Sequence, residues 1–136
     1  MTEVEIVYEG GLRTRCVHEE SGEALRTDAP KDNQGKGEFF SPTDLIGVAL
    51  GSCILTIMGI YAKRHNLDLT GTKVNVSKEM KSGPRRIGKI TLNFTSPHKF
   101  DAEVQKQLEK AATECPVHAS LHPDLEQIVT FEWGKS

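Results

Sequence analysis

Residues 41–60 read SPTDLIGVALGSCILTIMGI, a helix start followed by an almost uninterrupted apolar run. Ser41 is suited to cap a helix, Pro42 to fill the first helical position where no N–H bond is needed, and Asp44 to face the positive helix end. These signals predict a helix that continues to about His65. Because the run is apolar on nearly every side, we expect the helix to be buried all round rather than along one face.

This helix is expected to lie inside the protein rather than across a membrane. Its apolar run covers residues 45–60, whereas a membrane span needs roughly 20 apolar residues. Gly47, Gly51 and Gly59 each weaken a helix by about 1 kcal/mol relative to alanine. Small residues at such positions usually permit another element to approach closely, so we expect a second helix to cross here.

Short extended segments are predicted upstream of the helix. Residues 4–8 alternate like a strand, a second stretch follows Gly10-Gly11 and runs through residues 13–17, and a third covers residues 24–27. Residues 29–40 form a polar loop that is long enough to act as a lid or a binding loop.

The downstream half predicts further strands and helices. Two antiparallel strands are expected at residues 72–80 and 86–95, joined by a turn at 81–85. An amphipathic helix is expected at residues 100–113 and a short helix within residues 116–123. A final strand is expected at residues 125–133. The predicted fold class is therefore α+β.

Length, composition and charge limit the function classes. A chain of 136 residues is expected to form one domain over residues 1–136. With 37% hydrophobic and 26% charged residues it reads as a soluble globular protein, and a net charge of −2 gives no reason to expect nucleic acid as a partner. The N-terminus lacks the basic start and apolar core of a secretion signal, so we expect the protein in the reducing cytoplasm with free thiols.

The cysteines lie in unlike settings. An odd number without export argues against a disulfide framework and leaves reactivity, metal binding or burial. Cys115 precedes Pro116 and is expected to cap a helix whose N–H groups favour the thiolate, although Glu114 opposes this effect. Cys53, in a buried helix, needs a nearby cation to react. Cys16, on a predicted outer strand, is expected to be structural.

Several alternatives remain open at this point. A helical cysteine is most often a packing residue. Cys115, His118 and His122 have spacings that place them on one helical face, which suits zinc but is a weak signal. His118 could instead act as a general base for Cys115. Candidate cations for Cys53 are Arg13, Arg15, Arg26, Lys31 and Lys36.

The motif SPTDLIGVALGSC at residues 41–53, followed by ECPV at residues 114–117, resembles the OsmC/Ohr family of small bacterial proteins. The family is named for osmotic induction and organic hydroperoxide resistance, and the resemblance covers essentially the whole chain in element order. It implies an obligate, intertwined homodimer in which antiparallel sheets wrap around long central helices, with active sites at the subunit interface.

The resemblance also implies a thiol-dependent peroxidase that reduces organic hydroperoxides. Carried onto this chain, Cys53 attacks the peroxide O–O bond, releases an alcohol and becomes a sulfenic acid. Cys115 then resolves it as a disulfide, which a dithiol such as a lipoyl group reduces. The family chemistry requires no metal or organic cofactor.

The chain departs from the family pattern where the thiol is activated. The family peroxidases have a glutamate directly after the proline that opens the helix, paired with an arginine that holds the thiolate; here the position is Thr43. Asp44 or Glu38 could substitute for this glutamate. The pattern is therefore closer to a less characterised OsmC-like branch of the family.

The activating arginine is also open at the sequence level. Early strands would supply Arg13 or Arg15, whereas the loop before the helix has Lys36 but no arginine, and lysine is a poorer match to a carboxylate. The alternative function is an OsmC-like dimer without efficient peroxidase activity, which binds a small apolar ligand or serves redox sensing.

Overall fold

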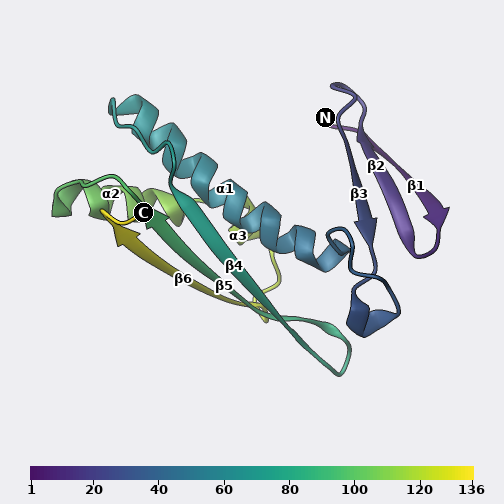
Figure 1. The fold of residues 1–136 in the computed structure, drawn as a ribbon. Coiled ribbons are helices and arrows are strands. Elements are labelled where there is room, and N and C mark those ends of the chain that lie inside the picture. Colours follow the sequence, from purple (N-terminus) through teal and green to yellow (C-terminus); the bar gives the residue numbers. More distant parts are fainter. The chain divides into compact units, whose positions relative to one another are not determined.

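The computed structural model describes residues 1–136, which form two three-stranded sheets and accompanying helices (Figure 1). The chain divides into two compact units, Met1–Ile46 and Gly47–Ser136, and the boundary falls within the long helix. The first unit contains β1 (Val4–Gly10), β2 (Arg13–His18), β3 (Ala24–Asp28), the short 3₁₀ helix η1 (Lys31–Asn33) and the start of α1 (Pro42–Arg64). The α+β class is confirmed, and the single-domain organisation stays a prediction.

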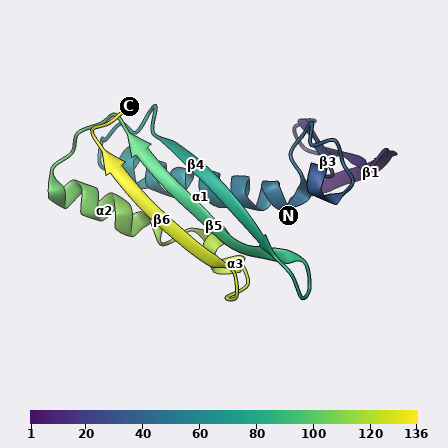
Figure 2. The ribbon, with the colours of Figure 1, turned by 60° about the horizontal axis from the view of Figure 1, so that its bottom comes forward.

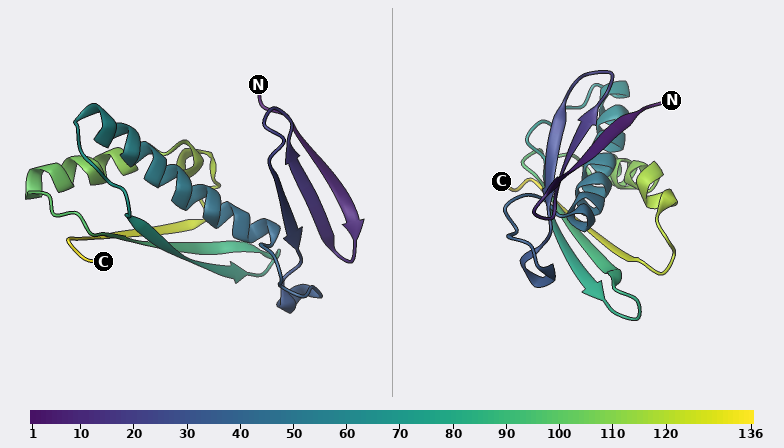
Figure 3. Two further views of the ribbon diagram at one scale, coloured as in Figure 1. Left: turned by 45° about the horizontal axis from the view of Figure 1, so that its top comes forward. Right: turned by 90° about the vertical axis from the view of Figure 1, so that its right-hand side faces the viewer.

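The first unit is built on an antiparallel sheet of β1, β2 and β3 in that order, drawn in purple in Figure 3. Gly10, Gly11 and Leu12 all have positive φ, which gives the tight turn between β1 and β2. Since β2 is the central strand, the expectation that Cys16 lies on an outer strand is wrong.

Alternation along the strands gives this sheet two different faces. Ile6 and Leu25 are both register partners of Cys16, so all three lie on one face, and Val4 and Tyr8 on β1 share it. Except for Cys16, these side chains are exposed in the single chain. The sheet therefore presents an apolar face that no residue of its own unit covers.

The start of α1 follows the sequence prediction. Asp44 donates its backbone N–H to Ser41 Oγ at 3.0 Å, and Ser41 donates its own N–H to Asp44 Oδ2 at 2.9 Å. This reciprocal pair satisfies N–H groups that the first helical turn leaves unbonded. The predicted boundaries of the helix are confirmed to within a residue.

The second unit is an α/β layer in which helices cover one face of a sheet (Figure 2). Its elements are β4 (Lys73–Lys81), β5 (Arg86–Ser96), α2 (Ala102–Ala112), α3 (Pro116–Ser120), β6 (Glu126–Trp133) and the larger part of α1. Strands β4 and β5 pair antiparallel as predicted, but β6 pairs parallel to β5. The sheet is mixed because the crossover through α2 and α3 returns the chain in the direction of β5.

The hydrophobic core of this unit lies between the sheet and the two longer helices. It is formed by fully or nearly fully buried apolar side chains on α1, β5 and α2: Leu50, Ile54, Met58, Ala62, Ile90, Leu92, Phe94, Leu108, Ala111 and Ala112. On β5 these residues alternate, as expected for a strand with one face on the core.

Helix α1 buries one face in the single chain, and the prediction of burial all round is wrong at this level. Val48 and Ile60, on its other side, are exposed. The glycines also act differently from expectation. A Cβ at Gly47 would lie 3.1 Å from Val76 of β4, and Gly51 is similarly close to Val74, so these glycines admit a strand rather than a second helix. Gly59 faces open space.

By length and composition alone, α1 could cross a membrane. It has 23 residues, and its most apolar 18-residue window has a mean hydropathy of 2.1. The prediction that the apolar run of this helix is too short to cross a membrane is therefore wrong as far as length and composition are concerned. The core helix of a soluble protein passes the same test, and the part of α1 in the second unit packs on the sheet as a core helix does.

Candidate functional site

Two of the three cysteines meet in the second unit. Cys53 lies in the middle of α1 and is half-buried, whereas Cys115 lies directly before α3 and is 1% exposed. The two thiols lie close enough for Cys53 to affect the pKa of Cys115, although 62 positions separate them in the sequence (115 − 53). The fold thus brings together the attacking and resolving candidates that the sequence proposed.

The position of Cys115 follows from the local sequence. Helix α2 ends at Ala112, and Pro116 occupies the first position of α3, where its missing N–H costs nothing. The Cys115 Sγ accepts a hydrogen bond from the backbone N–H of His118 at 3.3 Å. Cys115 therefore caps α3, as predicted.

The cap does not make Cys115 a thiolate. Burial raises the pKa of the Cys115 thiol above its ordinary value, and the hydrogen bond with Cys53 raises it further. The backbone N–H groups of His118 and Val117 act in the opposite direction and are outweighed. The predicted preference for the thiolate is therefore wrong: Cys115 is a protonated thiol at neutral pH, placed beside the sulfur of Cys53.

A cavity of about 320 Å³ lies among residues close in sequence to both cysteines. Its lining is mainly apolar with three polar side chains: Ile54, Glu109, Ala112, Thr113, His118, Val129 and Phe131. This volume is at the small end of the range for ligand pockets. The second unit therefore has space for a small organic molecule, although neither Cys53 nor Cys115 lines this cavity.

The histidines near Cys115 have other partners. The His118 Nδ1 hydrogen-bonds with Gln127 Oε1, and the His122 Nδ1 accepts the backbone N–H of Asp124 at 3.0 Å. No group of three or more His, Cys, Asp or Glu side chains in the chain forms a candidate metal site. His118 contacts the Cys115 sulfur through its backbone N–H, so the ring geometry gives no support to a general-base role.

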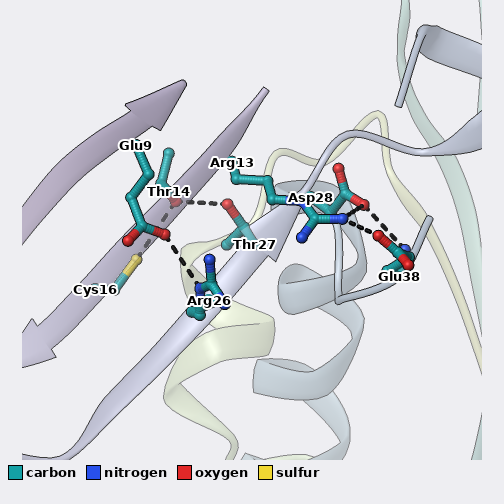
Figure 4. A network of polar contacts seen from close by, with 8 residues as sticks. All are labelled: Glu9, Arg13, Thr14, Cys16, Arg26, Thr27, Asp28 and Glu38. Atoms are coloured by element: carbon teal, nitrogen blue, oxygen red, sulfur yellow. Dashed lines mark hydrogen bonds and ion pairs between the residues drawn. The ribbon is translucent and has the colours of Figure 1, made fainter. Parts of the chain in front are cut away.

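The two candidate arginines lie on β2 in the first unit, and Figure 4 shows Arg13 beside Asp28 and Glu38. Arg13 is half-buried, forms an ion pair with Glu38, and places Nη2 3.5 Å from Asp28 Oδ2. Its guanidinium also lies 4.9 Å from the centre of the Phe39 ring. Arg15 is exposed, and no ion pair or hydrogen bond of its side chain is found.

The two carboxylates expected to replace the family glutamate, Glu38 and Asp44, have different partners. Glu38 pairs with Arg13, as one of the two sequence alternatives proposed, whereas Asp44 bonds to the backbone of Ser41 at the helix start. The sequence reading missed Asp28, which is 1% exposed. The signal that could have found it was an acidic residue at the end of a predicted strand, in register with Arg13 on the neighbouring strand.

A family model described as OsmC-like protein matches residues 35–127, more than half of the chain. The chain belongs to the OsmC-like family. Its members include peroxidases, are associated with the oxidative stress response and are typically oligomeric.

Solved structures agree with the family assignment. This OsmC-like chain is 44% identical to a protein of Psychrobacter arcticus 273-4, provisionally described as an osmotic stress induced and detoxification response protein; the match covers 97% of this chain and 96% of that chain, with a TM-score of 0.93. An organic hydroperoxide resistance protein OsmC from Legionella pneumophila shares the fold at 13% identity, with a TM-score of 0.77 and coverage of 97% and 96%.

A more distant likeness extends to Elizabethkingia anophelis. Its organic hydroperoxide resistance protein, with thiocyanate bound, is 17% identical over 97% of this chain and 95% of that chain, with a TM-score of 0.75. At these low identities the similarity concerns the fold. A search of curated proteins found no match.

Proposed function

We propose that this OsmC-like protein is a thiol-dependent peroxidase that reduces organic hydroperoxides to alcohols. The observation that carries the proposal is the proximity of Cys53 to the buried thiol of Cys115, whose pKa Cys53 helps to raise. A peroxidase that recycles through an intramolecular disulfide needs two such thiols. The names of the Legionella and Elizabethkingia proteins support the substrate class.

In the first step the Cys53 thiolate attacks the outer peroxide oxygen. A sulfur–oxygen bond forms, the O–O bond breaks, and the alkoxide leaves and takes a proton to become the alcohol. Cys53 is thereby oxidised by two electrons to a sulfenic acid while the hydroperoxide is reduced. The cavity of about 320 Å³ in the second unit is the proposed space for the organic part of the substrate.

In the second step Cys115 attacks the sulfur of the Cys53 sulfenic acid. The Cys53–Cys115 disulfide forms, and the sulfenic oxygen leaves as water with the proton of the Cys115 thiol. A small dithiol, of which a lipoyl group is one example, then reduces the disulfide to the two thiols and is itself oxidised. The raised pKa of Cys115 keeps this thiol protonated, and therefore inert toward peroxide, until Cys53 is oxidised.

Arg13 is our proposed source of the cation that stabilises the Cys53 thiolate. Of the two candidates, Arg13 is held by carboxylates and an aromatic ring, whereas Arg15 is an exposed side chain opposite Arg26. A fixed guanidinium stabilises an anion at a lower entropic cost than a mobile one.

The working form is proposed to be a homodimer in the cytoplasm, with active sites at the subunit interface. The apolar face of the first sheet and the exposed apolar side of α1, with Val48 and Ile60, are the surfaces a second copy would cover. Light scattering coupled to size exclusion tests this point: a mass near 30 kDa, twice the 15.0 kDa of one chain, is expected, and a 15 kDa species contradicts it.

The activity itself is tested by peroxide consumption. Reduced protein is mixed with an organic hydroperoxide and a dithiol, and peroxide loss is compared with a Cys53→Ser variant. Cys16→Ser is the matched control because Cys16 is the cysteine without a role in the proposed mechanism, and it should keep wild-type rates. Equal, slow consumption by wild type and Cys53→Ser would refute the peroxidase proposal.

A second candidate function is supported by Thr43, which stands where the family peroxidases carry a glutamate. In this alternative the dimer binds a small apolar ligand or senses oxidants through the thiol pair without efficient turnover. It predicts one equivalent of peroxide consumed per Cys53, with no acceleration by added dithiol. Continuous consumption in the presence of dithiol favours the peroxidase.

A further inference from the structure

Asp28 occupies an unusual position for a carboxylate. It ends β3, lies in register with Arg13 on β2, and its side chain is fully buried. Burying a charge is costly unless it is paired and hydrogen-bonded. The contacts of Asp28 are therefore a guide to what its charge does.

The first set of contacts joins Asp28 to the loop that precedes α1. Its Oδ2 accepts the backbone N–H of Glu38 at 3.0 Å, and its own N–H donates to the carbonyl of Phe40 at 3.1 Å. Backbone N–H groups of Lys36 and Ala29 also help hold the pKa of Asp28 below its ordinary value, with the Glu38 N–H as the largest cause. Asp28 thus fastens both ends of this loop.

The second contact is with Arg13, and it explains why a charge is needed. An asparagine oxygen would also accept a loop N–H group, more weakly than a carboxylate but without the cost of a buried charge, and it would form no ion pair. The Oδ1 atom of Asp28 has no hydrogen-bond partner, so the loop does not use the whole carboxylate. The remaining use for the charge is the ion pair with the Arg13 guanidinium.

Arg13 is also held by Glu38, but this second carboxylate is of another kind. The Glu38 side chain is 57% exposed, whereas that of Asp28 is 0% exposed. Both carboxylates contact Arg13 through Nη2. Because a guanidinium has five N–H donors on three nitrogens, donors remain for an additional anion.

We propose that Asp28 is a positioning residue that holds Arg13 for its action on the Cys53 thiolate, in place of a carboxylate at position 43. The inference rests on the proposed function of Arg13. Asp28 supplies the fixed, buried contact, and Glu38 supplies an exchangeable contact from the loop that Asp28 itself anchors. The chain thereby has a carboxylate partner for its arginine on β3 instead of α1.

The test is a double-mutant cycle read by the alkylation rate of Cys53. Iodoacetamide is added to the reduced full-length protein across a pH series, and modification of Cys53 is followed by peptide mass spectrometry. Asp28→Asn is expected to slow alkylation at pH 7 about tenfold and to move the rate profile to higher pH. In an Arg13→Gln background the same Asp28→Asn change should alter the rate less than about twofold.

The direction of the change in alkylation rate shows whether Asp28 acts by positioning Arg13 or only through its own negative charge. Removing a negative charge without moving Arg13 favours a thiolate and speeds alkylation, whereas losing the position of Arg13 slows it. Glu9→Gln is the matched control: it removes a carboxylate of the same sheet that pairs with Arg26 rather than Arg13, and it should not slow alkylation. Faster or unchanged alkylation in a folded Asp28→Asn protein overturns the proposal, as does equal slowing in both backgrounds.

Two further outcomes are decided in advance. If Asp28→Asn does not fold, Asp28→Glu replaces it, because the longer side chain keeps the charge but cannot keep both contacts of Oδ2. Slower alkylation in the protein with the natural Arg13, and not in the Arg13→Gln variant, supports the proposal. No slowing overturns it. Arg13→Gln with wild-type alkylation also overturns it. Failure of the peroxidase proposal would be seen separately, as absence of Cys53-dependent peroxide consumption.

Discussion

The thiol pair and the arginine cluster divide the requirements of thiol chemistry between two regions of the chain. The pair Cys53–Cys115 supplies two sulfur atoms in largely apolar surroundings, where burial keeps Cys115 protonated. The cluster of Arg13, Asp28 and Glu38 supplies a held cation and has no nucleophile. The structure brings the two sulfurs together within one unit. In the proposed mechanism their reactivity depends in addition on the charge of Arg13.

Removing the sulfur of Cys115 should have the largest effect on peroxide consumption. With Cys115→Ser, Cys53 can still be oxidised, but nothing inside the chain resolves its sulfenic acid. We expect roughly one turnover per Cys53 followed by arrest, and a sulfinic acid on Cys53 when peroxide is in excess. Stopped-flow peroxide consumption and intact mass check this. Continued turnover at the wild-type rate would show that Cys115 is not the resolving thiol.

Changing the charge of the arginine cluster should have the next largest effect. Arg13→Gln is expected to lower kcat/KM for an organic hydroperoxide about tenfold or more, because the thiolate loses its cation. Arg15→Gln is the matched control from the same strand, and a change below about threefold is expected. The proposed choice between the two arginines is wrong if Arg15→Gln has the larger effect.

A third prediction uses the burial of Cys115. Its folded-state pKa lies above the ordinary value of 9.0, so the native state holds the proton more tightly than the unfolded chain. The stabilisation is fully present below that ordinary value and is lost as pH rises through the folded pKa. The Tm of the reduced protein should therefore fall as the pH rises above about 9, and it should fall less in Cys115→Ala. Equal declines in both proteins would contradict the raised pKa.

The smallest effect is expected beside the turn of the β4–β5 hairpin, in a cluster of ion pairs that includes neither paired cysteine nor any residue of the arginine cluster. Asp124 pairs with Lys81 Nζ at 2.8 Å and with Arg86 Nε at 3.1 Å, which hold its pKa below the ordinary value of 3.8. Asp124→Asn should lower the Tm slightly at pH 7 and leave peroxide consumption unchanged. The difference should vanish as pH falls through the folded-state pKa, because the wild-type carboxyl is then protonated. A loss of peroxidase activity would contradict the separation of this cluster from the chemistry.

Local signals made most of the fold predictable from the sequence. Ser41, Pro42 and Asp44 mark the helix start through backbone bonding that involves only neighbouring residues, and the strands are marked by alternation. The roles of Gly47 and Gly51 could not be predicted, because they depend on which distant element packs on α1. The same limit applies to β6, whose direction depends on the crossover before it.

The candidate site was predictable in its sulfurs and less so in its charges. The motif residues Cys53 and Cys115 are recognisable in the sequence, and their contact is a result of tertiary folding. Asp28 gave only the weak signal of an acidic residue at a strand end, and its burial depends on the strand register and the loop folded over it. The protonation of Cys115 was predicted wrongly because burial outweighs the helix cap.

The most direct test of the central claim is the mass of the protein after oxidation. Reduced wild-type protein is treated with one equivalent of an organic hydroperoxide, quenched with an alkylating agent and analysed intact and after digestion. We predict the loss of two hydrogens and a linked peptide pair that joins Cys53 to Cys115, with Cys16 alkylated. A protein that instead gains oxygen on Cys53 while Cys115 remains alkylated, or that forms its disulfide through Cys16, would contradict the account.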